Sequence, residues 1–169
     1  MNPSSSDCLQ GADKSERKAN VLFLCTGNTC RSQMAEGFAR RVCSDHLQAY
    51  SAGVDPGTLD ARAVQVMAEI GIDISEQRPK SIDSLGAIPF DVVITLCDHA
   101  NETCPYFPGK VLRLHRGFDD PPRMAAEEAK EESILNAYRK VRDEIRSFVA
   151  ALPDILQEHG LRPPSSEGC

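Results

Sequence analysis

The chain has 169 residues, a length that suits one domain with a full hydrophobic core, and its formal net charge is −6 at pH 7. The acidic balance argues against a protein that coats nucleic-acid phosphates, and no apolar run approaches the roughly 18 residues that a membrane span needs. The first residues lack the apolar stretch of a secretory signal, so we expect a cytoplasmic protein. We also expect a monomer. Seven cysteines then stand out, because thiols in a reducing compartment are more often reactive than structural.

The predicted elements alternate between strands and helices. Residues 1–18 and 161–169 are polar and aperiodic, and we expect them to form a disordered lead-in and tail around one domain at 19–160. Within the domain, apolar runs predict strands at 19–25, 47–53, 91–97 and 111–115.

Helical periodicity fills the intervals between the strands. The first helix is predicted over 31–46, and the second is capped by Asp60 and ended by Gly71. A third helix follows the last strand. The predicted inward faces, in chain order, consist of Met34, Phe38 and Val42; of Val64, Met67 and Ala68; and of Ile134, Tyr138, Val141, Ile145, Phe148 and Leu152.

This alternation predicts an α/β fold, a single doubly wound domain with a four-stranded parallel sheet and helices on both faces. In such sheets the active site lies beyond the carboxyl ends of the strands. Cys25 and Cys97 each end a predicted strand, so we expect the two thiols to share one site.

The first strand is followed by CTGNTCRS, residues 25–32, which leads directly into a helix. The backbone N–H groups of such a loop can point inward and bind an anion. Glycine and asparagine within the loop permit unusual backbone angles, and the arginine fork can hold two oxygens of a tetrahedral oxyanion. The sequence therefore predicts an oxyanion site formed by Thr26, Gly27, Asn28, Thr29, Cys30, Arg31 and Ser32.

Cys25 opens this loop and is the candidate nucleophile. An ordinary thiol has a pKa of about 8.5, and we expect the loop amides and the helix dipole to lower the pKa of Cys25 to roughly 4–7. Ser32 could donate a further hydrogen bond to the thiolate. The alternative is a structural cysteine at a strand end and a surface arginine at position 31; the placement of the loop between strand and helix favours the site.

The run VLFLCTGNTCRSQMAEGF resembles the active-site loop of the low-molecular-weight tyrosine phosphatase fold. Within it, CRSQMAEGF is particularly similar to the thioredoxin-coupled arsenate reductases of that fold. The resemblance continues through SAG (51–53), DVVITLC (91–97) and HRGFDDP (115–121), so it covers about 19–160. It implies a low-molecular-weight tyrosine phosphatase-like domain with arsenate reductase activity.

Cys97 and Cys104 form a further candidate pair, seven positions apart. Thiols at this spacing could bond only if the segment between them rearranges. The alternatives are a small core residue at Cys97 with Cys104 incidental, or a zinc site. Because His99 has no second Cys or His pair at a suitable spacing, no metal site is expected. The resemblance implies a redox role for both thiols.

The remaining cysteines rank lower as functional candidates. Cys30 lies within the loop, where it could form a protective bridge, and Cys43 is predicted to face the core. Cys8 and Cys169 fall in the predicted lead-in and tail.

A carboxylic acid and a cation site complete the predicted machinery. The acid of an Asp-Pro turn in RGFDDPP could protonate a leaving oxygen, the alternative being an acidic surface turn; the resemblance selects Asp120 rather than Asp119. Related arsenate reductases hold potassium near the loop with Asn, Glu, Ser and Asp. Here the matching positions are occupied by Asn28, Glu36, Ser51 and Lys80, so we expect the Lys80 ammonium to replace the ion.

The resemblance implies a three-cysteine relay. Cys25 attacks arsenate held by Arg31, Asp120 protonates the leaving oxygen, and Cys97 then attacks the Cys25 sulfur and releases arsenite. Cys104 stores the oxidation as a disulfide with Cys97, and reduced thioredoxin resets the enzyme. Phosphate and sulfate would compete as oxyanions, and no organic cofactor is needed. Two alternatives stay open: a phosphotyrosine or small-phosphate monoesterase, and a non-catalytic redox sensor.

Overall fold

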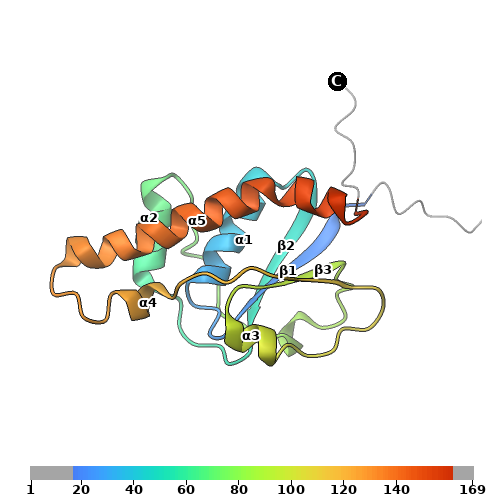
Figure 1. The fold of residues 1–169 in the computed structure, drawn as a ribbon, viewed down its shortest axis with the longest axis horizontal. Helices are drawn as coiled ribbons and strands as arrows, with labels where there is room; N and C mark the ends of the chain where they lie inside the picture. The colour runs from blue at the N-terminus through green and yellow to red at the C-terminus, as the bar shows by residue number, and fades with distance from the viewer. Residues whose placement is uncertain (1–16, 162–169) are drawn as a thin grey trace, which may run out of the picture.

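Four parallel strands form the centre of the structure, a computed structural model that describes residues 17–161. They lie in the order β2-β1-β3-β4, with β1 and β3 inside and the short β4 at one edge (Figure 1). Their bounds are Ala19–Cys25 for β1, Leu47–Gly53 for β2, Val92–Thr95 for β3 and Leu112–His115 for β4. The predicted four-stranded parallel sheet is confirmed.

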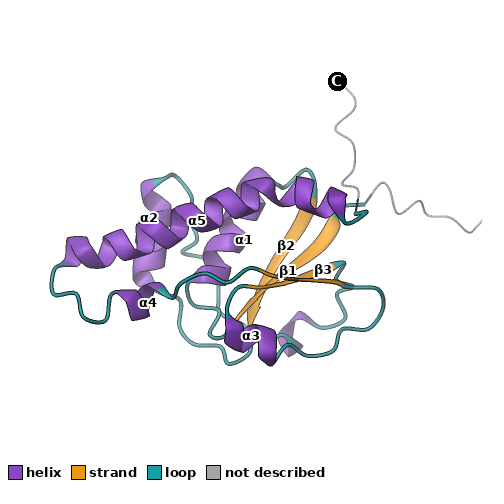
Figure 2. Cartoon of the chain, viewed as in Figure 1, coloured by secondary structure: helices purple, strands orange, loops and turns teal. Residues whose placement is uncertain are grey.

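The two faces of the sheet are covered differently. The larger core joins one face to α1 (Arg31–Val42), α2 (Ala61–Glu69) and α5 (Glu131–Glu158), with α5 running across the layer (Figures 1 and 2). The smaller core on the other face is closed by α3 (Asp98–Glu102), the 3-10 turn η1 (Asp83–Leu85) and loops. A one-turn helix, α4 (Pro121–Met124), precedes α5. Long helices therefore cover one face and short segments cover the face beneath Cys97.

The predicted face of α1 is wrong at its end. The helix stops at Val42 rather than His46, and Val42 is 53% exposed. Met34 and Phe38 are buried as predicted, and Ala39 completes the buried face. The reason is geometric: a step of four residues overshoots one turn of 3.6, so the third position of an i, i+4 series rotates away from the core.

The predicted face of α2 lies one residue too far along the chain. Met67 is buried, but Ala68 is exposed and Val64 is only partly buried; Ala63 and Val66 face the core instead. The predicted N-cap is confirmed, because the Asp60 side chain accepts hydrogen bonds from the first amides of the helix.

Cys97 was predicted to be the last residue of a strand. In the structure β3 ends earlier, at Thr95. Cys97 instead occupies the N-cap position of α3. The pairing of β3 with β4 ends at Thr95 and His115. The polar residues that follow Cys97 form the helix α3. The thiol still lies at the carboxyl end of the sheet.

The described range exceeds the predicted domain by a few residues. Arg17, placed in the lead-in by the prediction, forms a 2.7 Å ion pair with Asp91, and Leu161 packs against the larger core. The rest of the predicted lead-in and tail, with Cys8 and Cys169, lies outside the described residues. Between 17 and 161, no helix has the length and apolar character that crossing a membrane requires.

Asp60 provides a test of how the helices are fixed. Its Oδ1 accepts from the amide of Arg62 at 2.8 Å, and its Oδ2 accepts from the hydroxyl of Tyr138, a buried residue of α5, at 2.7 Å. Asp60→Ala removes the cap and leaves the tyrosine hydroxyl without its acceptor. We expect the free energy of unfolding to fall by about 2 kcal/mol, measured by urea denaturation.

Asp73→Ala is the matched control, because Asp73 caps only an exposed turn through the Ser75 amide. A loss in Asp60→Ala no larger than in this control would contradict the proposed coupling of α2 to α5.

Candidate active site

The loop after β1 is held in place by the segment that follows β2. Backbone amides of 54–60 donate hydrogen bonds of 2.8–3.1 Å to four loop carbonyls. The donor and acceptor pairs are Val54 with Cys25, Asp55 with Thr26, Gly57 with Gly27, and Asp60 with Thr29. With these carbonyls turned outward, the amides between them are free to face an anion, as the predicted oxyanion site requires.

Gly53 permits this contact between β2 and the loop. A Cβ at this position would lie 2.8–2.9 Å from three backbone atoms of residues 26–28, closer than packing allows. Gly27, by contrast, would bring its Cβ only to 3.2 Å from a threonine methyl group and has no positive φ. The glycine that the loop requires is therefore Gly53, whereas Gly27, expected to permit unusual backbone angles, has no positive φ.

Asn28 adopts the predicted left-handed conformation, with φ of 51°. Its side-chain oxygen accepts from the backbone amide of Lys80 at 3.0 Å and from Gln33 Nε2 at 3.1 Å, and Gln33 also bonds its carbonyl. Its Nδ2 donates to Ser32 Oγ at 2.8 Å. Ser32 thus supports Asn28; within residues 17–161 it makes no hydrogen bond to Cys25, so the predicted contact is absent.

Arg31 and Asp120 come together as predicted. Arg31 Nη2 lies 3.5 Å from Asp120 Oδ1, and Arg31 Nη1 donates to the Phe118 carbonyl at 3.0 Å. Asp119 points elsewhere, toward Lys140 of α5 at 3.9 Å, and is largely exposed. The geometry favours Asp120 as the acid that faces the loop.

The thiols of Cys25 and Cys97 meet at the mouth of the loop. Their sulfurs lie 3.7 Å apart, and the Thr26 hydroxyl is 3.2 Å from the Cys97 sulfur. A hydrogen bond from the Cys25 thiol, helped by Thr26 and Arg31, lowers the pKa of Cys97 to about 4. The same hydrogen bond, together with burial, raises the pKa of Cys25.

In this arrangement the hydrogen bond from Cys25 favours the thiolate of Cys97 over that of Cys25. The prediction of a low pKa at Cys25 is wrong for this arrangement, because the sequence did not reveal that a second thiol would lie at hydrogen-bond distance.

Cys104 is separated from this pair by α3. It is partly buried, and its sulfur lies 3.7 Å from the carbonyl oxygen of Pro105. Burial raises the pKa of the Cys104 thiol, and the nearby charge of Arg113 opposes that rise. The structure thus brings two of the three predicted redox cysteines together and keeps the third behind a helix.

The predicted cation site is built around Glu36, which is 1% exposed. Its carboxylate accepts a hydrogen bond from the Ser51 hydroxyl and forms ion pairs with Lys80 Nζ at 3.7 Å and with Arg40. Asn28 contacts Lys80 only through the backbone. Arg40, one helical turn from Glu36, was missed by the sequence analysis although its i, i+4 spacing was available.

Cys43 and Cys30 are both buried. Cys43 is buried and its sulfur lies 3.4 Å from the Val149 carbonyl, so its predicted packing role is confirmed. Cys30 is buried at the start of α1 as a free thiol, and burial raises its pKa. Its protective bridge stays a prediction. Among residues 17–161, no group of three or more His, Cys, Asp or Glu is arranged to hold a metal ion.

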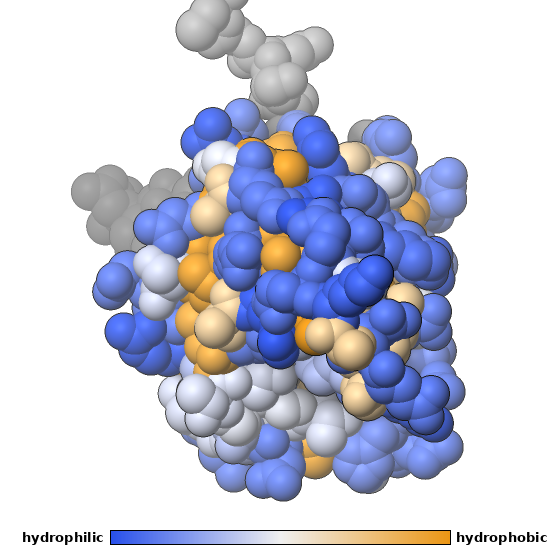
Figure 3. Space-filling view, turned by 90° about the vertical axis from the view of Figure 1, so that its left-hand side faces the viewer, coloured by the Kyte–Doolittle hydropathy of each residue, from blue (hydrophilic) through white to orange (hydrophobic). Residues whose placement is uncertain are grey.

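A cleft of about 750 Å³ opens over the loop. Its lining residues are Thr26, Arg31, Cys97, Asp98, His99, Gly117, Phe118, Asp119, Asp120, Arg123 and Met124. Figure 3 views the molecule from the end where α5 begins; this end is mostly hydrophilic, with scattered apolar residues. The cleft is lined by Cys97, Arg31 and Asp120, and the buried sulfur of Cys25 lies 3.7 Å from that of Cys97. This combination suits chemistry on a small oxyanion.

The thiol pair makes a pH-dependent prediction. With a pKa of about 4, Cys97 should be a thiolate at pH 7 and should lose its ultraviolet thiolate absorbance as the pH falls through about 4. Cys25→Ala removes the hydrogen-bond donor, so we expect the pKa of Cys97 to rise toward the ordinary thiol range. Cys43→Ala serves as the control and should leave the titration unchanged. Identical titrations of the wild type and Cys25→Ala would contradict the shared proton.

Proteins that are similar to this chain in sequence include phosphatases and arsenate reductases. The family described as low molecular weight phosphotyrosine protein phosphatase matches residues 20–161. The chain is 47% identical over 128 residues to an arsenate reductase of Halalkalibacterium halodurans, which covers 76% of this chain and 90% of that protein. It is 47% identical over 125 residues to an arsenate reductase of Bacillus subtilis, covering 74% of this chain and 88% of the relative.

Solved structures of an arsenate reductase and of a tyrosine phosphatase are similar to this structure. An arsenate reductase in a phosphate-binding state is similar with a TM-score of 0.64 and 30% identity, over 79% of this chain and 95% of that chain. A low molecular weight protein tyrosine phosphatase from T. tengcongensis is similar with a TM-score of 0.62 and 29% identity, over 82% of this chain and all of that one. The chain belongs to the low molecular weight phosphotyrosine protein phosphatase family.

Proposed function

We propose that this protein reduces arsenate to arsenite through a relay of Cys25, Cys97 and Cys104 that a reduced thioredoxin resets. The observation that carries the proposal is the 3.7 Å contact between the sulfurs of Cys25 and Cys97 above the oxyanion loop. A phosphate monoesterase of this fold needs only the first thiol. The two relatives that are 47% identical and named arsenate reductase support the same activity.

In the first step, the Cys25 thiolate attacks the arsenic of bound arsenate. A proton shift from Cys25 to Cys97 across the 3.7 Å contact moves the charge to Cys25, where a hydrogen bond from the Thr26 backbone and the charge of Arg31, which favours either thiolate, stabilise it. Asp120 gives its proton to the departing oxygen, which leaves as water. The product is a Cys25 sulfur bound to arsenic(V), with its oxygens held by the loop amides and Arg31.

In the second step, Cys97 attacks the Cys25 sulfur. The bond from sulfur to arsenic breaks and its electron pair stays on arsenic, so arsenic(V) becomes arsenic(III) and arsenite departs. A disulfide between Cys25 and Cys97 takes up the oxidation. Cys97 took up the Cys25 proton in the first step, and this proton leaves with arsenite as Cys97 attacks. The Thr26 hydroxyl, 3.2 Å from the Cys97 sulfur, and the charge of Arg31 remain in place and favour the thiolate, which is the attacking form.

In the third step, Cys104 attacks Cys97 and frees Cys25 as a thiolate. Cys97 caps α3 and Cys104 lies beyond its last turn, so the helical rise separates their Cα atoms by roughly 10 Å. A disulfide needs Cα atoms about 4.4–6.8 Å apart, so α3 must unwind. The dithiol of thioredoxin then reduces the exposed disulfide, which a reducing cytoplasm allows.

A phosphate monoesterase activity is the second candidate. It would use Cys25, Arg31 and Asp120. Arg31 and Asp120 line the cleft and lie 3.5 Å apart, and Cys25 opens the loop that carries Arg31. The similar tyrosine phosphatase structure favours retaining it as a side activity. The residues that follow Pro121 are Pro122 and Arg123, so no aromatic side chain stands there to stack on a phosphotyrosine ring.

The variants Cys97→Ser and Cys104→Ser test the relay. We expect both to lose at least about 100-fold of thioredoxin-coupled arsenate turnover, because each removes a thiol that no other group replaces. Hydrolysis of a small aryl phosphate should be retained, because the Cys25 loop is intact. The measurement is the oxidation of thioredoxin by arsenate, followed through its NADPH-dependent reductase.

Cys43→Ser is the matched control, since Cys43 is a packing residue distant from the relay. Unchanged arsenate turnover in Cys97→Ser or Cys104→Ser would remove the relay. Phosphate hydrolysis without any arsenate turnover in the wild type would favour the phosphatase.

We further propose that Lys80 supplies the charge that potassium would otherwise provide beside the loop. Its ammonium and Arg40 already balance the buried carboxylate of Glu36. An added cation would meet two positive side chains, so no potassium ion is needed.

Replacement of sodium by potassium should therefore leave arsenate turnover of the wild type unchanged at constant ionic strength. Lys80→Asp should make turnover depend on potassium, because it adds a carboxylate beside Glu36 and removes the ammonium. Arg78→Asp, on the neighbouring surface, is the control for a general charge effect. Marked potassium activation of the wild type would sink the proposal.

A further inference from the structure

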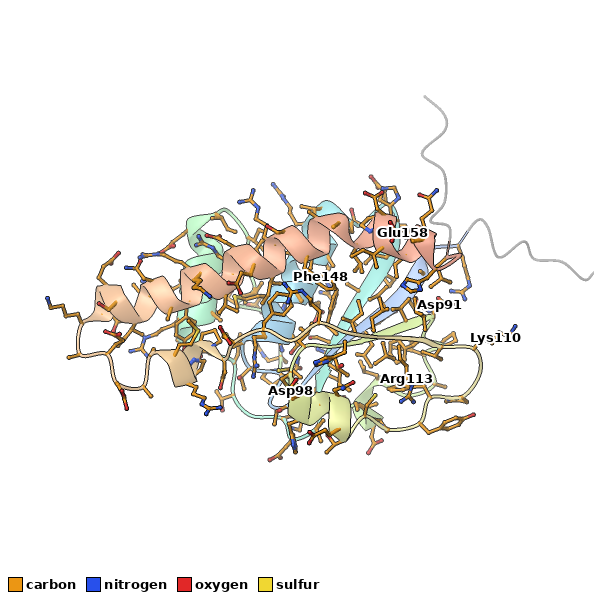
Figure 4. All side chains as sticks on the ribbon, in the orientation of Figure 1. Asp91, Asp98, Lys110, Arg113, Phe148 and Glu158 are labelled. Atoms are coloured by element: carbon orange, nitrogen blue, oxygen red, sulfur yellow. The ribbon has the colours of Figure 1, made fainter. Side chains whose placement is uncertain are left out.

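Two side chains of the edge strand β4 hold segment 98–105 in place. His115 Nε2 lies 3.1 Å from Asp98 Oδ1 at the start of α3. Arg113 Nη2 donates a 2.8 Å hydrogen bond to the Pro105 carbonyl at the other end of the segment. The two residues are two positions apart, so both project from the same face of β4. In Figure 4, Asp98 and Arg113 lie on the side of the molecule that carries α3 and β4.

His115 is itself fixed by β3. Its Nδ1 lies 2.8 Å from the hydroxyl of Thr95, which is 3% exposed and lies 3.3 Å from Asn101 Oδ1 of α3. The imidazole therefore connects the ends of two strands to the short helix. Its orientation is determined from both sides.

The packing behind α3 is loose. A cavity of about 100 Å³ lies between the helix and β4, with Asn101, Cys104 and Arg113 among its lining residues. Few apolar contacts can hold a helix of five residues beside such a cavity, so the polar contacts from β4 carry much of its stability.

We propose that Arg113 and His115 form a clasp that stabilises the helical, dithiol form of segment 98–105 and so controls how readily Cys104 bonds to Cys97. They are positioning residues, because neither touches a reacting sulfur. The physiological meaning of the clasp rests on the proposed relay, but its physical effect does not. Stabilising the dithiol raises the reduction potential of the couple, so loosening the clasp should lower it.

The reduction potential of the Cys97–Cys104 disulfide tests the clasp. The parent protein is Cys25→Ser, which prevents the competing disulfide to Cys97. In dithiothreitol buffers, the two thiols give two electrons and two protons to the oxidised, cyclic form of the reagent, which opens to its dithiol. The fraction of linked peptide is measured by mass spectrometry after acid quenching and alkylation.

We expect His115→Ala to favour the disulfide about 3- to 10-fold, as the loss of one polar contact predicts, which lowers the potential by about 15 to 30 mV. Arg113→Ala should act in the same direction. Because Arg113 also lowers the pKa of Cys104, His115→Ala is the decisive variant. Asp98→Asn keeps an oxygen acceptor for His115 and should shift the potential less than Asp98→Ala.

Hydrogen exchange gives a second readout. The amides of Asn101 and Thr103 bond to carbonyls within the α3 turn, and their exchange should accelerate about 3- to 10-fold in His115→Ala. Lys110→Ala, on the exposed loop before β4 (Figure 4), is the control and should change neither quantity.

Two outcomes would overturn the clasp: an unchanged potential in His115→Ala, with or without faster exchange, or an equal shift in Lys110→Ala. Both measurements are made without arsenate. A wild type that fails to reduce arsenate would therefore refute the proposed function and leave the clasp to be judged by its own data.

Discussion

The candidate site depends on the backbone hydrogen bonds between the loop after β1 and the segment 54–60 after β2. These bonds turn four loop carbonyls away from the site and leave the intervening amides for an anion. They form only because β2 approaches the loop at a glycine, Gly53, where any side chain would meet the backbone. The pairing of two neighbouring strands thus determines the conformation of the loop that carries the candidate nucleophile.

The positive side chains near the loop contrast with the negative net charge of the whole chain. The net charge of −6 would repel an oxyanion at long range, so binding must rest on the loop amides and on Arg31. A buried carboxylate so close to such a site would oppose it. Lys80 and Arg40 offset that carboxylate at Glu36, and the loop can keep a positive potential. The acidic composition therefore excludes a broad basic surface without excluding a small anion site.

The segments that cover the two faces of the sheet differ in stability. Long helices and the larger core cover the face of α1 and α5, whereas α3 covers the other face beside a cavity. The proposed thiol exchange between Cys97 and Cys104 would require movement, and movement costs least where apolar burial is small. Cys97 and Cys104, the proposed redox pair, lie on the face where a segment can unwind while the main core stays intact.

The family resemblance selected Asp120 and the redox role of Cys97. The sequence by itself determined the parallel α/β order and predicted the oxyanion loop, with Cys25 as its candidate nucleophile and Arg31 as its cation. These follow from short-range features: apolar runs, helical periods, and a glycine- and asparagine-containing loop between a strand and a helix. The helix faces were predicted less well. Steps of four residues overshoot the 3.6-residue turn at Val42, and the face of α2 that included Ala68 was placed one residue too far along the chain.

Only the tertiary structure decided which sulfur carries the charge, which side chains balance Glu36, and what holds α3. Each of these depends on a distance between segments far apart in the chain: 3.7 Å between Cys25 and Cys97, 3.7 Å between Glu36 and Lys80, and 3.1 Å between Asp98 and His115. Hydrogen bonds and ion pairs change steeply over about an ångström, and local sequence patterns carry no information at that precision.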